Sequence, residues 1–228
     1  MRLLKINRIS MWLVVFTCLL SLSSCFDIIE EINVKQDGSG SMTLTVNLSK
    51  SKTKLASIML LDSINGHKVP QKQDIETALN QAVEYLQQAS GISNIQKKTD
   101  FNNFIFSLSC DFKQVKDIDM VIREVTKELK VKPFTTSFSF DNSSKTFQRE
   151  NTFSTSAKRE YTDLQSDDQQ IFDDSFYTCI YRFEKEVNHY SNANAKLSKS
   201  KKAVMLRASA LDVINGKTSL SNKITLSK

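Results

Sequence analysis

The chain has 228 residues and a formal net charge of +6, from 31 lysines and arginines against 25 aspartates and glutamates. Residues 1–24 hold three of the basic residues and none of the acidic ones, so the remainder carries 28 basic against 25 acidic residues. That balance gives no support to nucleic-acid binding. Residues 25–228 suffice for one large domain or two small lobes.

The first 24 residues have the layout of a secretory signal. Three basic residues precede an apolar run over residues 11–22, which is shorter than the roughly 20 residues that span a bilayer. The run ends in Leu22-Ser23-Ser24-Cys25, the lipobox pattern of an aliphatic residue, two small residues and a cysteine. We therefore expect cleavage after Ser24 and a palmitate-bearing, lipid-modified Cys25. The alternatives are an ordinary signal peptide with a chance cysteine, or an uncleaved anchor.

Cys25 would place the protein in the cell envelope of a bacterium. Phe26, rather than an aspartate, follows the cysteine, which under the enterobacterial sorting rule favours the outer membrane over the inner one. The chain has no second run of about 18 apolar residues, so we expect no other segment to cross a membrane.

Residues 25–152 are predicted to form an α+β lobe. Residues 28–36 and 41–48 alternate apolar and polar side chains around Asp37-Gly38, which predicts an opening β-hairpin. A short helix with Leu55, Ile58 and Met59 on one side should end before Asn65-Gly66.

A longer helix is predicted after Pro70, with Asp74 as its N-cap and Gly91 at the C′ position. Residues 92–98 and 101–112 read as strands around Thr99-Asp100, and the apolar spacing over residues 115–129 predicts an amphipathic helix closed by Pro133. Residues 134–140 form a further strand, whose turn at residues 141–144 leads to another.

Residues 153–228 should contain a polar segment followed by a β-rich C-terminal part. Strands are expected at residues 176–187, 203–211 and 218–226, the last two joined by a hairpin at Asn215-Gly216. The predicted fold class is α+β, mostly antiparallel sheet with two or three amphipathic helices.

Two further cysteines, Cys110 and Cys179, lie in strand-like runs. Each shares its period-2 face with aromatic residues, so both should point into apolar interior. An oxidising compartment permits a disulfide between them. Two buried thiols explain the pattern equally well.

The arrangement resembles the LppM-type bacterial lipoprotein domain. The resemblance lies in the lipobox, the hairpin of residues 32–46 around Asp37-Gly38-Ser39-Gly40, and an Asn-rich turn in residues 187–195 that leads to a strand at 203–208. The sequence departs from the family in having no tryptophan in the closing strands and no C-terminal membrane helix. The resemblance implies a non-enzymatic envelope protein that contacts lipid or glycolipid, and supplies no catalytic residues.

The sequence lacks complete forms of several catalytic and cofactor-binding motifs. Gly216-Lys217-Thr218 would need a glycine where Leu211 stands to form a phosphate-binding loop, and Gly38-Ser39-Gly40 lacks the rest of a dinucleotide site. His67 and His189 have no motif partners for zinc, and no G-x-S-x-G elbow presents a nucleophile. We expect no cofactor.

Two charged clusters admit a surface interpretation as well as a functional one. The acidic residues lack the ligand spacing of a calcium loop, so a solvated segment is preferred; they are Asp163, Asp167, Asp168, Asp173 and Asp174. The basic cluster could meet anionic lipid head groups, but a solvated hairpin loop is the simpler interpretation; it comprises Lys196, Lys199, Lys201 and Lys202.

The leading hypothesis is a non-catalytic, lipid-anchored binding or structural module, with no nucleic-acid partner. The alternative is an envelope hydrolase whose active-site residues are dispersed in sequence. A pocket holding His67 or His189 beside a serine or aspartate would favour the hydrolase.

Overall fold

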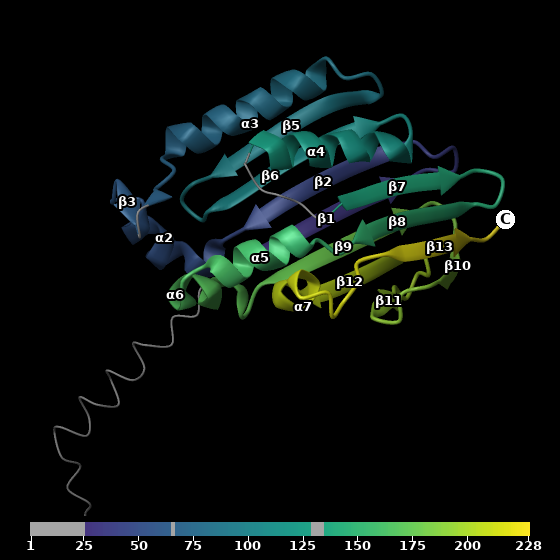
Figure 1. The fold of residues 1–228 in the computed structure, drawn as a ribbon. Coiled ribbons are helices and arrows are strands. Elements are labelled where there is room, and N and C mark those ends of the chain that lie inside the picture. The colour runs from purple at the N-terminus through teal and green to yellow at the C-terminus, as the bar shows by residue number, and fades with distance from the viewer. Residues whose placement is uncertain (1–25, 65–66, 129–134) are drawn as a thin grey trace, which may run out of the picture.

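The computed structural model describes residues 26–64, 67–128 and 135–228. Its main element is a seven-stranded sheet (Figure 1). In spatial order the strands are β11 (Ala195–Leu197), β12 (Ala203–Ser209), β9 (Phe176–Phe183), β1 (Asp27–Val34), β2 (Gly40–Asn47), β6 (Ile105–Phe112) and β5 (Ile92–Asp100). All neighbours pair antiparallel except β1 and β9, which run parallel. The predicted α+β class with mostly antiparallel sheet is confirmed.

A four-stranded sheet packs on the large one. Its order is β10 (Val187–Tyr190), β13 (Asn222–Leu226), β8 (Thr146–Thr152) and β7 (Thr135–Asp141). Phe147 of β8 joins the two sheets, because its ring centroid lies 4.8 Å from that of Tyr181 and 5.7 Å from that of Phe183, both on β9. The small sheet therefore covers β1, β9 and β12 rather than standing apart.

Helices complete the second layer and the ends of the molecule. The short ones include α2 (Lys52–Ile58), α6 (Ser166–Gln169) and α7 (Ala210–Ile214); the longer ones are α3 (Lys72–Gln87), α4 (Ile118–Glu128) and α5 (Thr155–Asp163). Single 3-10 turns span Ser49–Ser51, Val115–Asp117 and Gln170–Phe172, and β3 (Ser63–Ile64) pairs with β4 (His67–Lys68). Figure 1 shows α3 and α4 beside the small sheet, over β5, β6 and β2.

The boundary that the sequence analysis drew between residues 152 and 153 does not separate two spatial units. β1 of the first part pairs with β9 of the second along its whole length, and β8 pairs with β13. Each sheet thus draws strands from both sides of the division, and the hydrophobic core is shared. Local sequence patterns cannot reveal this, because a parallel β1–β9 pair depends on contacts about 150 residues apart.

Both predicted ends of the long helix were wrong. The N-cap is Gln71, whose N–H donates to Asp74 Oδ2 at 2.9 Å, so Asp74 is the third helical residue of a capping box. The helix ends at Gln87, and Gly91 lies beyond it with φ +91° at the start of β5. The long helix itself is confirmed.

The predicted hairpin at Asn215-Gly216 is also wrong. β12 and β13 belong to different sheets, and Gly216 follows α7 with φ +70°. Its N–H donates to Val213 O at 3.1 Å while Lys217 N–H donates to Asp212 O at 2.8 Å, which is the Schellman pattern of a helix end. Asn-Gly serves a helix C-terminus as readily as a hairpin, and only the tertiary structure distinguishes them.

The strand predictions differ from the structure mainly at their ends. The expected strand at 176–187 is divided into β9 and β10, which lie in different sheets, and the β5–β6 turn falls after Asp100. The polar segment is partly helical through α5 and α6. Phe134, Pro133 and Asn65-Gly66 lie outside the described residues.

A buried ion pair connects the centres of the two sheets. Glu30 of β1 and Arg149 of β8 are 0% and 2% exposed, and Arg149 Nε and Nη2 donate to the Glu30 carboxylate at 3.2 and 3.4 Å. The hydroxyls of Tyr177 and Tyr181 donate to the same carboxylate at 2.8 Å each. Arg149 Nη1 has no hydrogen-bond partner among the described residues.

The Arg149 guanidinium stays charged in spite of its burial. Burial by itself lowers its pKa, but Glu30 together with Cys179, Tyr181 and Tyr177 raises that pKa well above its usual value. Burial and the Glu30 charge both raise the pKa of Tyr177, so its phenol stays protonated and able to donate. Glu30 is thus satisfied by one cation and two hydroxyl donors.

Cys110 and Cys179 are buried, unbridged thiols. Cys110 lies on β6 and Cys179 on β9, with β2 and β1 between them. Three strand spacings amount to about 14 Å, whereas a disulfide needs Cα atoms within about 7 Å. The structure therefore agrees with the free-thiol alternative.

We predict that neither thiol reacts with iodoacetamide in the native protein at about pH 8. Burial raises the pKa of Cys110 to about 11 and that of Cys179 to about 12, so the reactive thiolate is scarce. Mass spectrometry should find both residues alkylated after denaturation without reductant. An oxidised pair in the purified protein would contradict the strand order.

We also predict that Arg149→Met lowers the free energy of unfolding by about 3–5 kcal/mol, because Glu30 would stay buried without its cation. Adding Glu30→Gln should recover part of that loss, since the amide carries no charge and still meets Tyr177 and Tyr181. Urea unfolding of the two single variants and the double variant measures the coupling.

The matched control is Arg182→Met, which breaks a 3.0 Å ion pair between β9 and Glu31, the residue after Glu30 on β1. Both partners are partly exposed, so the expected loss is about 0–1 kcal/mol. Equal losses for Arg149→Met and Arg182→Met would show that burial of the Glu30 pair does not stabilise the fold.

Candidate functional site: the N-terminal rim of the large sheet

One end of the large sheet collects the segments closest to the chain's N-terminus. The strand registers align six residues in a single row across it: Asp100, Ile105, Asn47, Asp27, Phe176 and Ser209. We call this end, with the loops that extend from it, the N-terminal rim. It is the left end of the molecule in Figure 1, where α2, β3 and α6 lie.

Phe26 is fixed on this rim. Its N–H donates to Ser175 Oγ at 3.0 Å and its carbonyl accepts the Phe176 N–H at 3.0 Å. Its ring meets that of Phe172 edge-on at 5.4 Å. Ser175 is itself 0% exposed, so the chain is held by ordered structure from its first described residue onward.

The segment after β2 turns back over the same rim. Asn47 Oδ1 accepts the Ser49 N–H at 3.0 Å, and the Leu48 N–H donates to Phe104 O at 2.9 Å. Lys50 Nζ lies 3.5 Å from Asp27 Oδ2. These contacts hold the start of α2 beside the first residue of β1.

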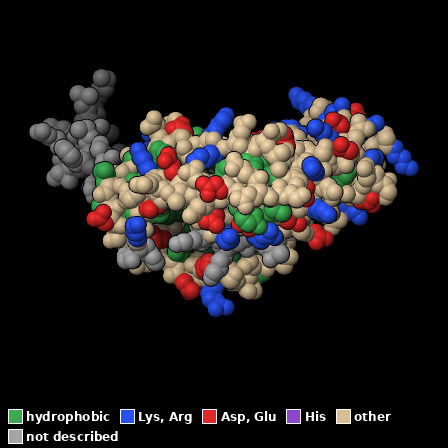
Figure 2. All heavy atoms as spheres, turned by 90° about the horizontal axis from the view of Figure 1, so that it is seen from above, with side chains coloured by type: hydrophobic (Ala, Val, Ile, Leu, Met, Phe, Trp, Pro, Cys, Tyr) green, Lys and Arg blue, Asp and Glu red, His purple; other side chains and the backbone are tan. Residues whose placement is uncertain are grey.

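Beyond α2 the chain exposes apolar side chains. Leu60 is 87% exposed, Leu61 47% and Ile64 39%. We call these three side chains the apolar tip. Figure 2 shows apolar, basic and acidic side chains interspersed at the left of the molecule, the side of the N-terminal rim.

A groove of about 650 Å³ lies beneath the apolar tip. Its apolar wall is formed by Ala56, Met59, Leu60, Phe101 and Phe104, and Lys52 and Lys72 border it. The Lys72 ammonium lies 5.6 Å from the Phe101 ring centroid, a cation–π contact. The groove is therefore apolar inside and basic at its edge.

The β5–β6 turn that supplies Phe101 and Phe104 is held by Asp100. Its carboxylate accepts the N–H groups of Asn102 and Asn103 at 2.9 and 3.0 Å and the Asn103 amide at 2.8 Å. The hydrogen bonds from Asn103 lower the pKa of Asp100. Phe104, with φ +54°, is thereby kept in a backbone conformation that aromatic residues rarely adopt.

Lysines outnumber acidic residues in the segment around the apolar tip. Residues 49–73 contain five lysines, at positions 50, 52, 54, 68 and 72, against one acidic residue, Asp62. Lys68 also approaches Asp74 at 3.6 Å, just beyond that segment. The α2–β4 region is consequently basic around an apolar centre.

The lysines proposed from sequence as head-group contacts lie away from the rim. Lys196 is on β11, level with the middle of β1, and the other three are in the β11–β12 loop at the opposite end of the sheet: Lys199, Lys201 and Lys202. The Phe183 N–H donates to Lys202 O at 2.9 Å, and Phe183 pairs with Val34, the last residue of β1. The seven steps from Asp27 to Val34 separate this loop from the rim by about 23 Å.

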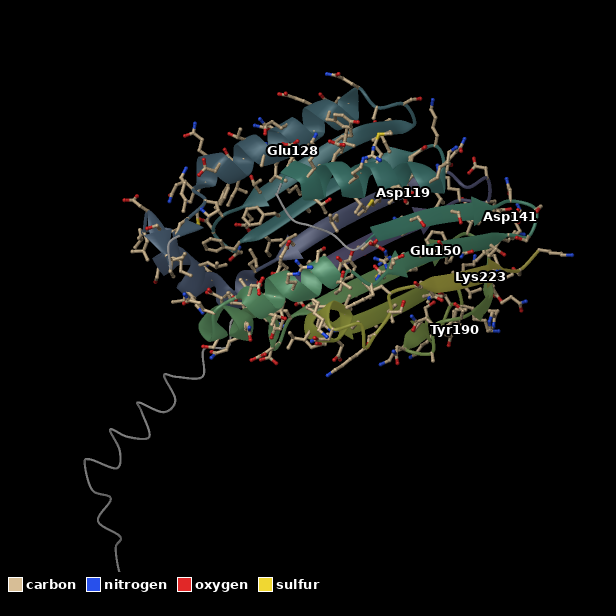
Figure 3. The ribbon with its side chains drawn as sticks, viewed as in Figure 1. Asp119, Glu128, Asp141, Glu150, Tyr190 and Lys223 are labelled. Atoms are coloured by element: carbon tan, nitrogen blue, oxygen red, sulfur yellow. The ribbon has the colours of Figure 1, made fainter. Side chains whose placement is uncertain are left out.

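The candidate catalytic and metal residues are not brought together. His189 is exposed on β10, and its ring takes part in no hydrogen bond among the described residues; the His67 side chain lies outside them. Within the described ranges there is no group of three metal-binding side chains. Figure 3 shows the labelled carboxylates of Asp119, Asp141 and Glu150 spread over α4, the β7–β8 turn and β8.

The sequence analysis missed the apolar tip. It placed Met59 on the apolar side of a short helix and did not single out Leu60, Leu61 or Ile64. The available signal was a run of three large apolar residues, 59–61, directly after a short helix with two lysines. Cys25 and Ser24 lie outside the described residues, so the structure locates the lipobox only through Phe26.

Among the described residues, none of the helices combines the length and the apolar character that crossing a bilayer requires. No protein-family model matches the chain, and no curated protein matches it. Among solved structures, the chain is similar to the NMR structure of the folded domain of LppM from Mycobacterium tuberculosis, at 8% identity over 90% of each chain with a TM-score of 0.43. A likeness at that level carries no functional argument.

Proposed function

We propose that this protein is a non-catalytic envelope lipoprotein, exported by residues 1–24 and held on a membrane by lipid on Cys25, where it contacts envelope lipid. The support is the lipobox Leu22-Ser23-Ser24-Cys25 at the end of a short apolar run. Two or three acyl chains, at about 0.8 kcal/mol per buried CH₂, are sufficient for stable attachment.

The position of Phe26 is the observation that carries this proposal. Cys25 is its direct neighbour, so their Cα atoms are about 3.8 Å apart, and Phe26 is bound on both backbone groups by Ser175 and Phe176. β1 begins at Asp27, so Phe26 is the one residue between the lipobox cysteine and the central strand of the large sheet. A lipid on Cys25 would therefore be attached almost directly to the sheet.

We predict that the native protein begins at Cys25 and that this residue carries a diacylglyceryl thioether. Mass spectrometry of the N-terminal peptide tests both points directly. The Cys25→Ala variant should lack the lipid, whereas Cys18→Ala, within the apolar run, should leave modification unchanged. An unmodified Cys25, or a start at another residue, would remove the basis of the proposed function.

Residue 26 further predicts the destination of the lipoprotein. Phe26 is no inner-membrane retention signal under the enterobacterial rule, so density-gradient separation should find the protein with outer-membrane markers. The comparison is Phe26→Asp, which should move the protein toward the inner membrane. Wild-type protein found solely with inner-membrane markers would show that this destination is wrong.

A further inference from the structure

We infer that the N-terminal rim docks on the surface of an anionic phospholipid bilayer, with the apolar tip in the head-group region and the lysines of α2 against the phosphates. The inference rests on the lipid anchor proposed above. It adds an orientation of the folded chain and a second membrane contact made by its own side chains.

The first argument is the short distance between the anchor and the rim. Phe26 has no freedom to act as a spacer, because its N–H, its carbonyl and its ring are all bound. A lipid on Cys25 would therefore hold the bilayer surface against Asp27 and the Lys50 that pairs with it. The apolar tip and the lysines of α2, which extend from the rim, would then contact the membrane.

The second argument is the distribution of exposed apolar side chains. Seven large apolar side chains are exposed in the described parts of the chain, and three of them fall within residues 60–64. Leu60, at 87%, is the most exposed of the seven. Isolated exposed apolar residues are common, but a cluster at one point marks an interaction surface.

The third argument is charge. Lys52, Lys54 and Lys72 are exposed around the tip and the groove beneath it. Peripheral membrane segments combine apolar side chains buried about 5–10 Å into the head-group boundary with basic side chains that meet anionic lipids. The apolar centre and basic border of the rim have this composition.

Tryptophan fluorescence can test the docking in the full lipidated chain. Trp12 is the single native tryptophan and lies in the segment removed on export, so Leu60→Trp supplies the sole indole of the mature protein. The matched control is Leu197→Trp, at a 36% exposed leucine on β11 beside the opposite rim. Both variants are reconstituted in phosphatidylcholine–phosphatidylglycerol vesicles with or without brominated acyl chains.

Docking predicts that brominated lipid lowers the emission of Leu60→Trp roughly twofold with a blue shift, because its indole would enter the boundary region. The emission of Leu197→Trp should not change, since the registers place Leu197 level with Ile32, about 17 Å along the strands from the rim. Unchanged unfolding midpoints of both variants confirm that the substitutions leave the fold intact.

Variants that remove positive charge test the head-group contact. Lys52→Gln with Lys54→Gln, in the Leu60→Trp background, should weaken docking on these vesicles roughly 30-fold, as two lysines contribute about 1 kcal/mol each near an anionic surface. The matched pair Lys196→Gln with Lys199→Gln removes the same charge on β11 and in the loop after it, away from the N-terminal rim, and should have no effect.

Vesicle flotation distinguishes failure of the lipid anchor from failure of the docking. Protein that floats but shows equal quenching for Leu60→Trp and Leu197→Trp retains its anchor and overturns the docking. Protein that does not float and carries no lipid overturns the anchor and the docking with it. A concentration-dependent blue shift of Leu60→Trp without vesicles would assign the tip to a second copy of the chain and overturn the lipid contact.

Discussion

The buried pair of Glu30 and Arg149 sets the relation between the two layers of this protein. One partner comes from the centre of the large sheet and the other from the small sheet. Neither charge reaches water, so each would be costly to bury without the other. A packing of the two sheets that separated these charges would leave each buried alone, so the pair disfavours it.

β1 is the strand on which both the core and the N-terminal rim depend. It pairs with β2 on one side and with β9 on the other, and it carries Glu30 in its middle. The residue before it, Phe26, is held by the start of β9. Because β1 is a central strand, its first residue is as firmly placed as the core itself, and a lipid on the preceding cysteine would bind a rigid body to the bilayer.

The two ends of the large sheet have similar composition but different positions relative to the N-terminus. Both expose leucine or methionine near lysines, at residues 52–64 and at residues 196–205. By sequence the second cluster was the more conspicuous, because its lysines are closely spaced. The strand registers show that the first lies beside Phe26 and the second at the far end of β1. With the proposed lipid on Cys25, proximity to that residue rather than local composition would decide which cluster meets the membrane.

The sequence by itself determined the local features: the opening hairpin, the long helix, the fold class and the alternation that buries Cys110 and Cys179. These follow from patterns within about twenty residues, where period and turn chemistry act directly. The signal and the lipobox cleavage and lipidation stay predictions. Only the tertiary structure decided that β1 lies beside β9, that Asn215-Gly216 ends a helix, that the two cysteines are three strands apart and that Leu60 is exposed at the N-terminal rim. Each of these depends on which distant segments become neighbours, and that is set by burial of the Glu30–Arg149 pair and the shared core rather than by any local pattern.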